Sequence, residues 1–107
     1  MSFNALFIAH APDADKIIHR SRIETGMYKL VTVIVKTQAE AIQVCHELAE
    51  KEQIDSILLC PGFTHRNVAE IVEATDNKIA VVVARGDRPS GKIVKAAFQR
   101  ARYGPKK

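Results

Sequence analysis

The sequence predicts an α/β protein with a truncated flavodoxin-like fold. In this fold a four-stranded parallel sheet, of strand order 2-1-3-4, forms the middle of a three-layer αβα sandwich. Four short apolar runs alternate with stretches of helical spacing, and crossovers of this length require parallel strands. The chain has 107 residues, is 47% hydrophobic and contains no Trp. We therefore expect a single domain over residues 1–107 with an aliphatic core.

The first strand is predicted at Asn4–Ala9, because its continuous apolar run is typical of a strand covered on both faces. A helix is expected to follow from Pro12, with Asp13 as its cap. Residues 24–26 would end this helix. Its predicted inner face consists of Ala14, Ile17, Ile18 and Ser21.

The second strand is predicted at Tyr28–Lys36, which is rich in β-branched residues. Thr37 and Glu40 have the spacing of a capping box, in which each side chain accepts the backbone amide of the other residue. The helix that they begin should run to about Gln53. Its predicted inner residues are Ala41, Ile42, Cys45, Leu48 and Ala49.

The third strand is predicted at Ile54–Cys60, and a helix capped by Thr64 follows a Pro61-Gly62 turn. The inward stripe of that helix is Val68, Ile71, Val72 and Thr75.

The fourth strand is predicted at Lys78–Arg85, and a last helix at about Ser90–Arg102. Its predicted buried stripe is Ile93, Val94, Ala97, Phe98 and Ala101. Residues 104–107 are expected to form a frayed tail.

With strand order 2-1-3-4 the sheet reverses direction between its first and third strands, and ligands of open α/β sheets bind outside the carboxyl ends at that point. Free amides at the start of a helix favour an anion, and Arg66 or Arg85 could complete a bidentate clamp. We therefore predict a site for a small anionic ligand there. Its residues would be His10, Cys60, Gly62, Phe63, Thr64, His65, Arg66 and Arg85.

An alternative is a small cysteine and histidine-dependent enzyme. A thiol near a helix start and a histidine has a lowered pKa, so Cys60 would be the nucleophile and His10 or His65 the base. Against this, Cys60 ends an apolar strand, and free cysteines are among the most buried residues. Whether the protein is an enzyme therefore stays open, with Cys60 and His10 as the candidate catalytic residues.

A second alternative is a regulatory interaction module with a basic C-terminal helix. Residues 85–107 contain eight Lys or Arg and one acid, a net charge of +7, whereas residues 1–84 carry −3. Nucleic-acid binding usually adds exposed aromatic residues, and Tyr103 is the single candidate here, which argues against that partner. Two unguarded edge strands instead predict a homo-oligomer, a dimer or larger.

Other classes are disfavoured by specific residues. Gly86–Lys92 has the spacing of a phosphate-binding loop, but Ile93 stands where Ser or Thr would hold magnesium. His10, Cys60 and His65 match no compact metal-ligand motif, and we expect neither a metal nor a cofactor. No apolar run approaches the roughly 20 residues of a membrane span. Two cysteines and no convincing signal peptide predict a cytoplasmic protein with reduced thiols.

The stretch Ile57-Leu-Leu-Cys60-Pro-Gly62-Phe63, together with His19-Arg20 and Ile23-Glu24 upstream, resembles a family of short uncharacterised bacterial α/β proteins, catalogued as a domain of unknown function. The resemblance covers about residues 3–87 and implies the fold but no activity. If its pattern marks a site, it adds His19, Arg20 and Glu24 to the candidates. Members of the family often have Gly in place of Pro61. On the predicted first helix, an Arg20–Glu24 ion pair would be the simpler role.

Overall fold

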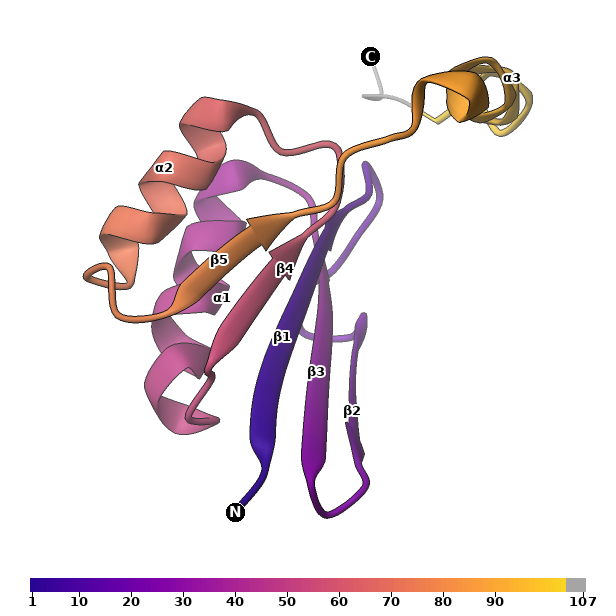
Figure 1. The fold of residues 1–107 in the computed structure, drawn as a ribbon. Coiled ribbons are helices and arrows are strands. Elements are labelled where there is room, and N and C mark those ends of the chain that lie inside the picture. Colours follow the sequence, from indigo (N-terminus) through magenta and orange to yellow (C-terminus); the bar gives the residue numbers. More distant parts are fainter. Residues whose placement is uncertain (104–107) are drawn as a thin grey trace.

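The computed structural model describes residues 1–103, which form a five-stranded sheet of order β2-β3-β1-β4-β5 with helices (Figure 1). The α/β class predicted from the sequence is confirmed. The strands are β1 (Phe3–His10), β2 (Arg20–Glu24), β3 (Tyr28–Val35), β4 (Ser56–Leu59) and β5 (Ala80–Val83). The helices are α1 (Gln38–Lys51), α2 (His65–Ala74), the short 3-10 helix η1 (Arg88–Ser90) and α3 (Gly91–Arg100).

The four strands expected from the sequence are all present and parallel, and their relative order β3-β1-β4-β5 is the expected one. The expected sheet was nevertheless incomplete, because β2 adds a fifth strand that runs antiparallel to β3. The second predicted strand, now β3, is therefore not an edge. Within residues 1–103 the edge strands are β2 and β5.

The helix predicted from Asp13 is wrong. This segment forms turns and then β2. The Asp15 carboxylate accepts the amide of Ile17 at 2.9 Å, which stabilises a local turn. The predicted inner residues Ile17 and Ile18 are each 70% exposed, whereas Ala14 is buried.

Pairing with β3 explains why residues 20–24 are extended. The two strands form a hairpin around Gly26, whose φ of +105° is readily adopted only by glycine. The amide of Thr25 donates to the carbonyl of Tyr28, and the Thr25 hydroxyl accepts the Tyr28 amide. The backbone hydrogen bonds between β2 and β3 thus stabilise an extended conformation, although the spacing of apolar residues before β2 favours a helix.

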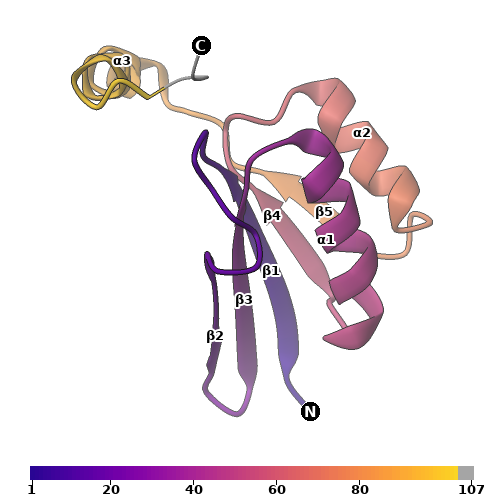
Figure 2. The same cartoon turned by 180° about the vertical axis from the view of Figure 1, so that it is seen from behind.

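Helices α1 and α2 lie on the same face of the sheet, as Figures 1 and 2 show from opposite sides. Between them and the strands lies an apolar core. Its members are Leu6, Ile8, Val31, Val33, Val35, Ala41, Val44, Cys45, Leu48, Ile54, Ile57, Leu59, Phe63 and Ile71. Burial raises the pKa of the Cys45 thiol to about 12, so this cysteine is an unreactive core residue.

The start of α1 agrees only in part with the predicted capping box. The Thr37 hydroxyl accepts the Glu40 amide at 3.2 Å, as expected. The Glu40 carboxylate, however, accepts the amide of Lys36 at 2.8 Å rather than that of Thr37.

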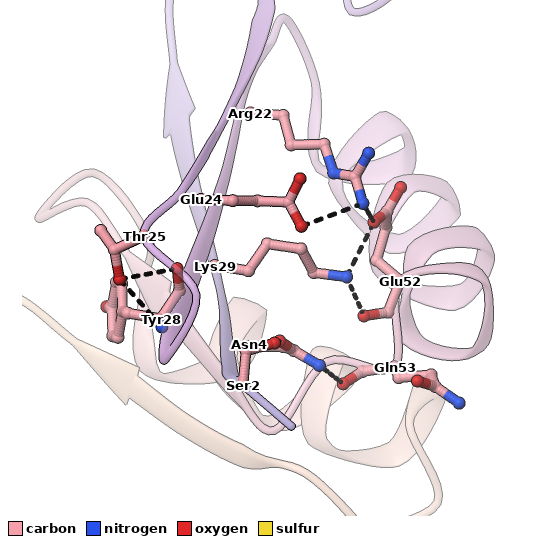
Figure 3. Close-up of polar contacts among 9 residues, drawn as sticks. All are labelled: Ser2, Asn4, Arg22, Glu24, Thr25, Tyr28, Lys29, Glu52 and Gln53. Atoms are coloured by element: carbon pink, nitrogen blue, oxygen red, sulfur yellow. Dashed lines mark hydrogen bonds and ion pairs between the residues drawn. The ribbon is translucent and has the colours of Figure 1, made fainter.

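The amino end of the sheet is held by partly buried polar contacts (Figure 3). Lys29 is only 8% exposed, and its Nζ donates to the carbonyl oxygen of Glu52 at 2.8 Å and to its carboxylate at 3.0 Å. Arg22 lies 3.5 Å from the same carboxylate. The side-chain amide of Asn4 donates to the carbonyl of Gln53 at 2.9 Å. These bonds satisfy polar groups that α1 and β1 bring together at this end.

The opposite face of the sheet, which we call the open face, is covered by no helix of residues 1–103 (Figures 1 and 2). The strand register assigns to it Phe3, Ala5, Phe7, Ala9, Ser21, Ile23, Tyr28, Leu30, Thr32, Ile34, Ser56, Leu58, Ala80 and Val82.

Helix α3 lies beyond the carboxyl ends of the strands rather than on the sheet. The stripe predicted to be buried is exposed: Ile93 is 72% exposed, Val94 47% and Phe98 48%. Burial of this stripe was therefore a wrong prediction for the single chain. The predicted tail, residues 104–107, lies outside the described residues. No helix of residues 1–103 has the length and apolar character to cross a membrane.

Candidate functional site

His10 and Cys60 lie at the same edge of the sheet because β1 and β4 are neighbouring parallel strands. Ile8 pairs with Leu59, and the Cys60 amide donates to the carbonyl of Ile8 at 3.0 Å. The two residues that leave these strands therefore emerge together, as expected for a site at the carboxyl ends.

The ring of His10 stacks on Phe63, with 4.0 Å between the ring centroids. Phe63 is 1% exposed, so it fixes one face of the imidazole against the core. Burial lowers the pKa of His10 from its ordinary value, because desolvation disfavours the charged ring. At neutral pH His10 is therefore an uncharged base and a hydrogen-bonding group.

Gly62 lies beside both polar side chains. A Cβ atom placed on Gly62 would be 3.5 Å from Nδ1 of His10 and 3.6 Å from Sγ of Cys60. The imidazole and the thiol thus border the same small space above the turn. Within residues 1–103 no hydrogen bond joins these two side chains.

The start of α2 is a capping box formed by Thr64 and Asn67. The Thr64 hydroxyl accepts the Asn67 amide at 3.1 Å, and the Asn67 side chain accepts the Thr64 amide at 2.9 Å. The predicted cap is therefore correct, and Asn67 completes it. Among residues 1–103, the backbone N–H groups of His65 and Arg66 donate no hydrogen bond. These two donors therefore point out of the amino end of α2 and are free to bind a ligand.

Arg85 reaches from the end of β5 to the start of α2. Its guanidinium donates to the carbonyl oxygen of Phe63 at 3.1 Å and to Nδ1 of His65 at 3.2 Å. Since Arg can only donate, Nδ1 of His65 is the acceptor in this hydrogen bond. No carboxylate of residues 1–103 pairs with Arg85, so its remaining N–H groups are open to an anion.

Arg66 is not part of this arrangement. It is exposed on the first turn of α2, and within residues 1–103 no hydrogen bond or ion pair links it to the other candidates. Of the two arginines in the predicted site, Arg85 and not Arg66 is hydrogen-bonded to other candidate residues.

Tyr103 joins the site and was not among the predicted site residues. Its hydroxyl donates to the carbonyl oxygen of His10, and its ring stacks on Phe98 with centroids 4.8 Å apart. The pKa of Tyr103 is raised, first by burial and then by electrostatic interaction with Cys60 and Asp13. The signal in the sequence was its position as an aromatic residue with a hydroxyl group in the basic terminal segment, which also contains Phe98.

The residues added by the family resemblance lie elsewhere. His19 precedes β2, and its Nδ1 accepts the amide of Asp15 at 2.9 Å. Arg20 donates from Nε to the carbonyl of Lys16 at 2.7 Å, and Glu24 pairs with Arg22 at 3.6 Å. The expected Arg20–Glu24 pair is therefore not formed, because the segment is a strand and not a helix.

A separate cavity of about 380 Å³ lies at the opposite, amino-terminal end of β4 and β5. It contains none of the candidate residues. It is lined by His46, Ala49, Glu50, Gln53, Ile54, Asp55, Ala74, Thr75, Asp76, Lys78 and Ile79. In the described part of the chain, no group of three or more His, Cys, Asp or Glu residues is arranged to hold a metal ion.

Comparisons with curated proteins and with solved structures give no match for this chain. A family comparison does match, over residues 3–99, and so extends past the residues 3–87 of the sequence resemblance to include most of α3. The match contains β1, the Cys60–Phe63 turn and Arg85. The chain therefore belongs to the family described as a family of unknown function, DUF6506.

Proposed function

We propose that the protein binds a small anionic molecule at the carboxyl ends of β1 and β4. The observation that carries this proposal is the position of Arg85, whose guanidinium is held by Phe63 and His65 beside the start of α2. Two free amides and a guanidinium without a carboxylate partner form a site suited to phosphate or carboxylate. His10 and Cys60 border the same region and would contact the rest of the ligand.

Inorganic phosphate is a direct probe of this site. In a titration followed by amide NMR at constant ionic strength, we expect the largest shifts at residues 62–67. Arg85→Gln should weaken binding by at least about tenfold, because a charged hydrogen bond contributes roughly 1.5–3 kcal/mol.

Arg100→Gln provides the matched control, since it removes the same charge from the exposed surface of α3. Its affinity for phosphate should equal that of the wild type. Equal weakening by the two substitutions, or shifts spread over all basic residues, would contradict a defined site at Arg85.

A second candidate function is catalysis by Cys60 with His10 as base. It is favoured by the common position of the thiol and imidazole beside Gly62, and by the neutral state of His10. The Cys60 thiol would give its proton to His10, and the resulting thiolate would attack an electrophilic carbon of a substrate. The bond from that carbon to its leaving group breaks as the C–S bond forms, and the leaving group departs with the electron pair.

Alkylation by iodoacetamide at neutral pH tests this second candidate. The Cys60 sulfur would displace iodide, and buried Cys45 serves as an internal control that should stay unmodified in the native protein. We expect His10→Ala to slow Cys60 alkylation by at least about tenfold. An unchanged rate in that variant would remove His10 as the base.

A further inference from the structure

The open face of the sheet is apolar and carries no charge. Its 14 strand positions contain 11 apolar or aromatic residues with Ser21, Thr32 and Ser56 as the polar exceptions. Ile23 is 59% exposed, Leu58 40% and Val82 51%. Parallel strands are normally covered on both faces, so this surface is of the kind that a third layer covers, and no helix of residues 1–103 does so.

Helix α3 presents a second unpaired apolar surface. Ile93, Val94, Ala97, Phe98 and Ala101 recur at helical spacing on one side of α3 and its C-cap, while Lys92, Lys95 and Gln99 point elsewhere. The stripe is the kind of helix face that normally packs on a sheet. A ten-residue helix is about 15 Å long, close to the roughly 13 Å of a four-residue strand such as β4.

The position of α3 separates these two surfaces within one chain. The segment after β5 carries α3 past the carboxyl edge of the sheet (Figures 1 and 2), and Tyr103 fastens the end of the helix to the carbonyl of His10. In this arrangement the stripe does not reach the open face of its own sheet.

We propose that a second copy of this chain covers the open face, and that the apolar stripe of α3 from each copy packs on the open face of the other. Both surfaces lack charge, and each occurs once per chain, so two copies satisfy them reciprocally in a two-fold dimer. The lysines on the polar side of α3 stay in water. The exchanged helix supplies the third layer that the sequence predicts for the fold.

Two substitutions, one on each surface, test the exchange. Leu58→Asp places a charge on the open face, and Val94→Asp places one on the stripe. Sedimentation and native mass spectrometry should find a dimer for the wild type. Each variant should raise the dissociation constant by at least about 100-fold, because each homodimer would bury two unpaired carboxylates.

Mixing the two variants gives the decisive result. In a mixed dimer, the intact α3 of the Leu58→Asp chain packs on the intact sheet of the Val94→Asp chain, so one of the two contacts is restored. We expect mixed dimers at concentrations where each variant alone is monomeric. Gln99→Asp adds the same charge on the opposite side of α3 and should leave the dimer unchanged.

Three outcomes would overturn the proposal. A monomeric wild type over the accessible concentration range would remove the second copy, whatever the variants do. Dimers of Val94→Asp as stable as those of the wild type would mean that the sheets pair without α3. A mixture of the two variants that stays monomeric would likewise contradict reciprocal exchange. Neither substitution alters His10, Cys60 or Arg85.

Discussion

Leu58 and Leu59 are neighbours in β4 with the same side chain, yet Leu59 is 0% exposed and Leu58 is 40% exposed. Leu59 faces α1, α2 and the core, whereas Leu58 lies on the open face. The same contrast holds over the whole sheet. The covered face carries the buried core, whereas the open face carries apolar residues that the single chain leaves exposed, such as Ile23 and Val82. Hydrophobicity along a strand thus does not by itself indicate which of the two faces the chain covers.

The largest expected effect on stability comes from shortening each of these two leucines in turn. In a background kept monomeric by Val94→Asp, Leu59→Ala should lower the free energy of unfolding by about 2–5 kcal/mol, because it leaves a cavity in the core. Leu58→Ala should lower it by less than about 1 kcal/mol in the same background. Urea unfolding measures both values. Equal losses for the two leucines would mean that the open face is packed within the single chain.

Replacing Lys29 measures how much its buried charge contributes to stability on the covered face. Because its ammonium group is buried and bonded to Glu52, Lys29→Met should cost about 1–3 kcal/mol of unfolding free energy. Lys51→Met removes the same charge from the exposed end of α1 and should change stability by less than about 0.5 kcal/mol. If both variants cost the same, net charge and not the buried contact would explain the loss.

The contact between Lys29 and Glu52 also makes the stability of the protein depend on pH. The hydrogen bond from Lys29 is the main cause that lowers the pKa of Glu52 below its ordinary 4.5. A lowered carboxyl pKa means that this stabilisation is complete above pH 4.5 and is lost as the pH falls through the lower folded-state value. Unfolding curves above and below pH 4.5 should therefore show a loss in the wild type that is smaller in Lys29→Met. Parallel pH profiles would assign the loss to other carboxylates.

Removing the N-terminal cap of α1 or α2 is expected to lower stability by less than the changes in the core. Thr64→Ala removes the hydroxyl that accepts the Asn67 amide and should cost about 1 kcal/mol. Thr37→Ala at the start of α1 is the matched change and should cost a similar amount. Thermal unfolding monitored by circular dichroism gives both values. A Thr64→Ala variant as stable as the wild type would show that the capping box contributes little.

The smallest expected effect is at Gly62, next to the candidate site. A methyl group there would make ordinary contacts of 3.5 Å with His10 and 3.6 Å with Cys60. Gly62→Ala should thus change unfolding free energy by less than about 0.5 kcal/mol. It should still slow alkylation of Cys60, because the methyl fills space between the two side chains. Unchanged alkylation would place the reagent's approach on another side of the thiol.

The four parallel strands and the starts of α1 and α2 were predictable because each depends on nearby residues. The order of these four strands followed from the rules for parallel crossovers, but the predicted sheet lacked β2, which pairs with β3. Continuous β-branched runs favour strands, and Thr37 and Thr64 can accept amides only three residues away. The same local information failed between residues 13 and 25. There the helical spacing of Ala14, Ile17 and Ile18 competed with a hairpin signal at Gly26, and pairing with β3 decided the result.

The candidate site was predictable in position and not in detail. Parallel strands bring His10 and Cys60 to one edge, so their common location follows from the strand order. The contact of Arg85 with Phe63, and the hydrogen bond from Tyr103 to His10, depend on how the loops and α3 pack and could not be predicted. No spacing rule relates a residue of α3 to one that leaves β1, because more than 90 residues separate Tyr103 from His10 along the chain.

The sequence by itself determined that this chain forms a parallel α/β sheet with an aliphatic core, because strand and helix periodicities are local properties of the chain. Only the tertiary structure decided that residues 20–24 form an antiparallel strand, that both long helices cover one face, and that the apolar stripe of α3 stays exposed. The physical reason is that periodicity states which side of an element is apolar. The burial partner of that side is selected by contacts between residues far apart in the chain.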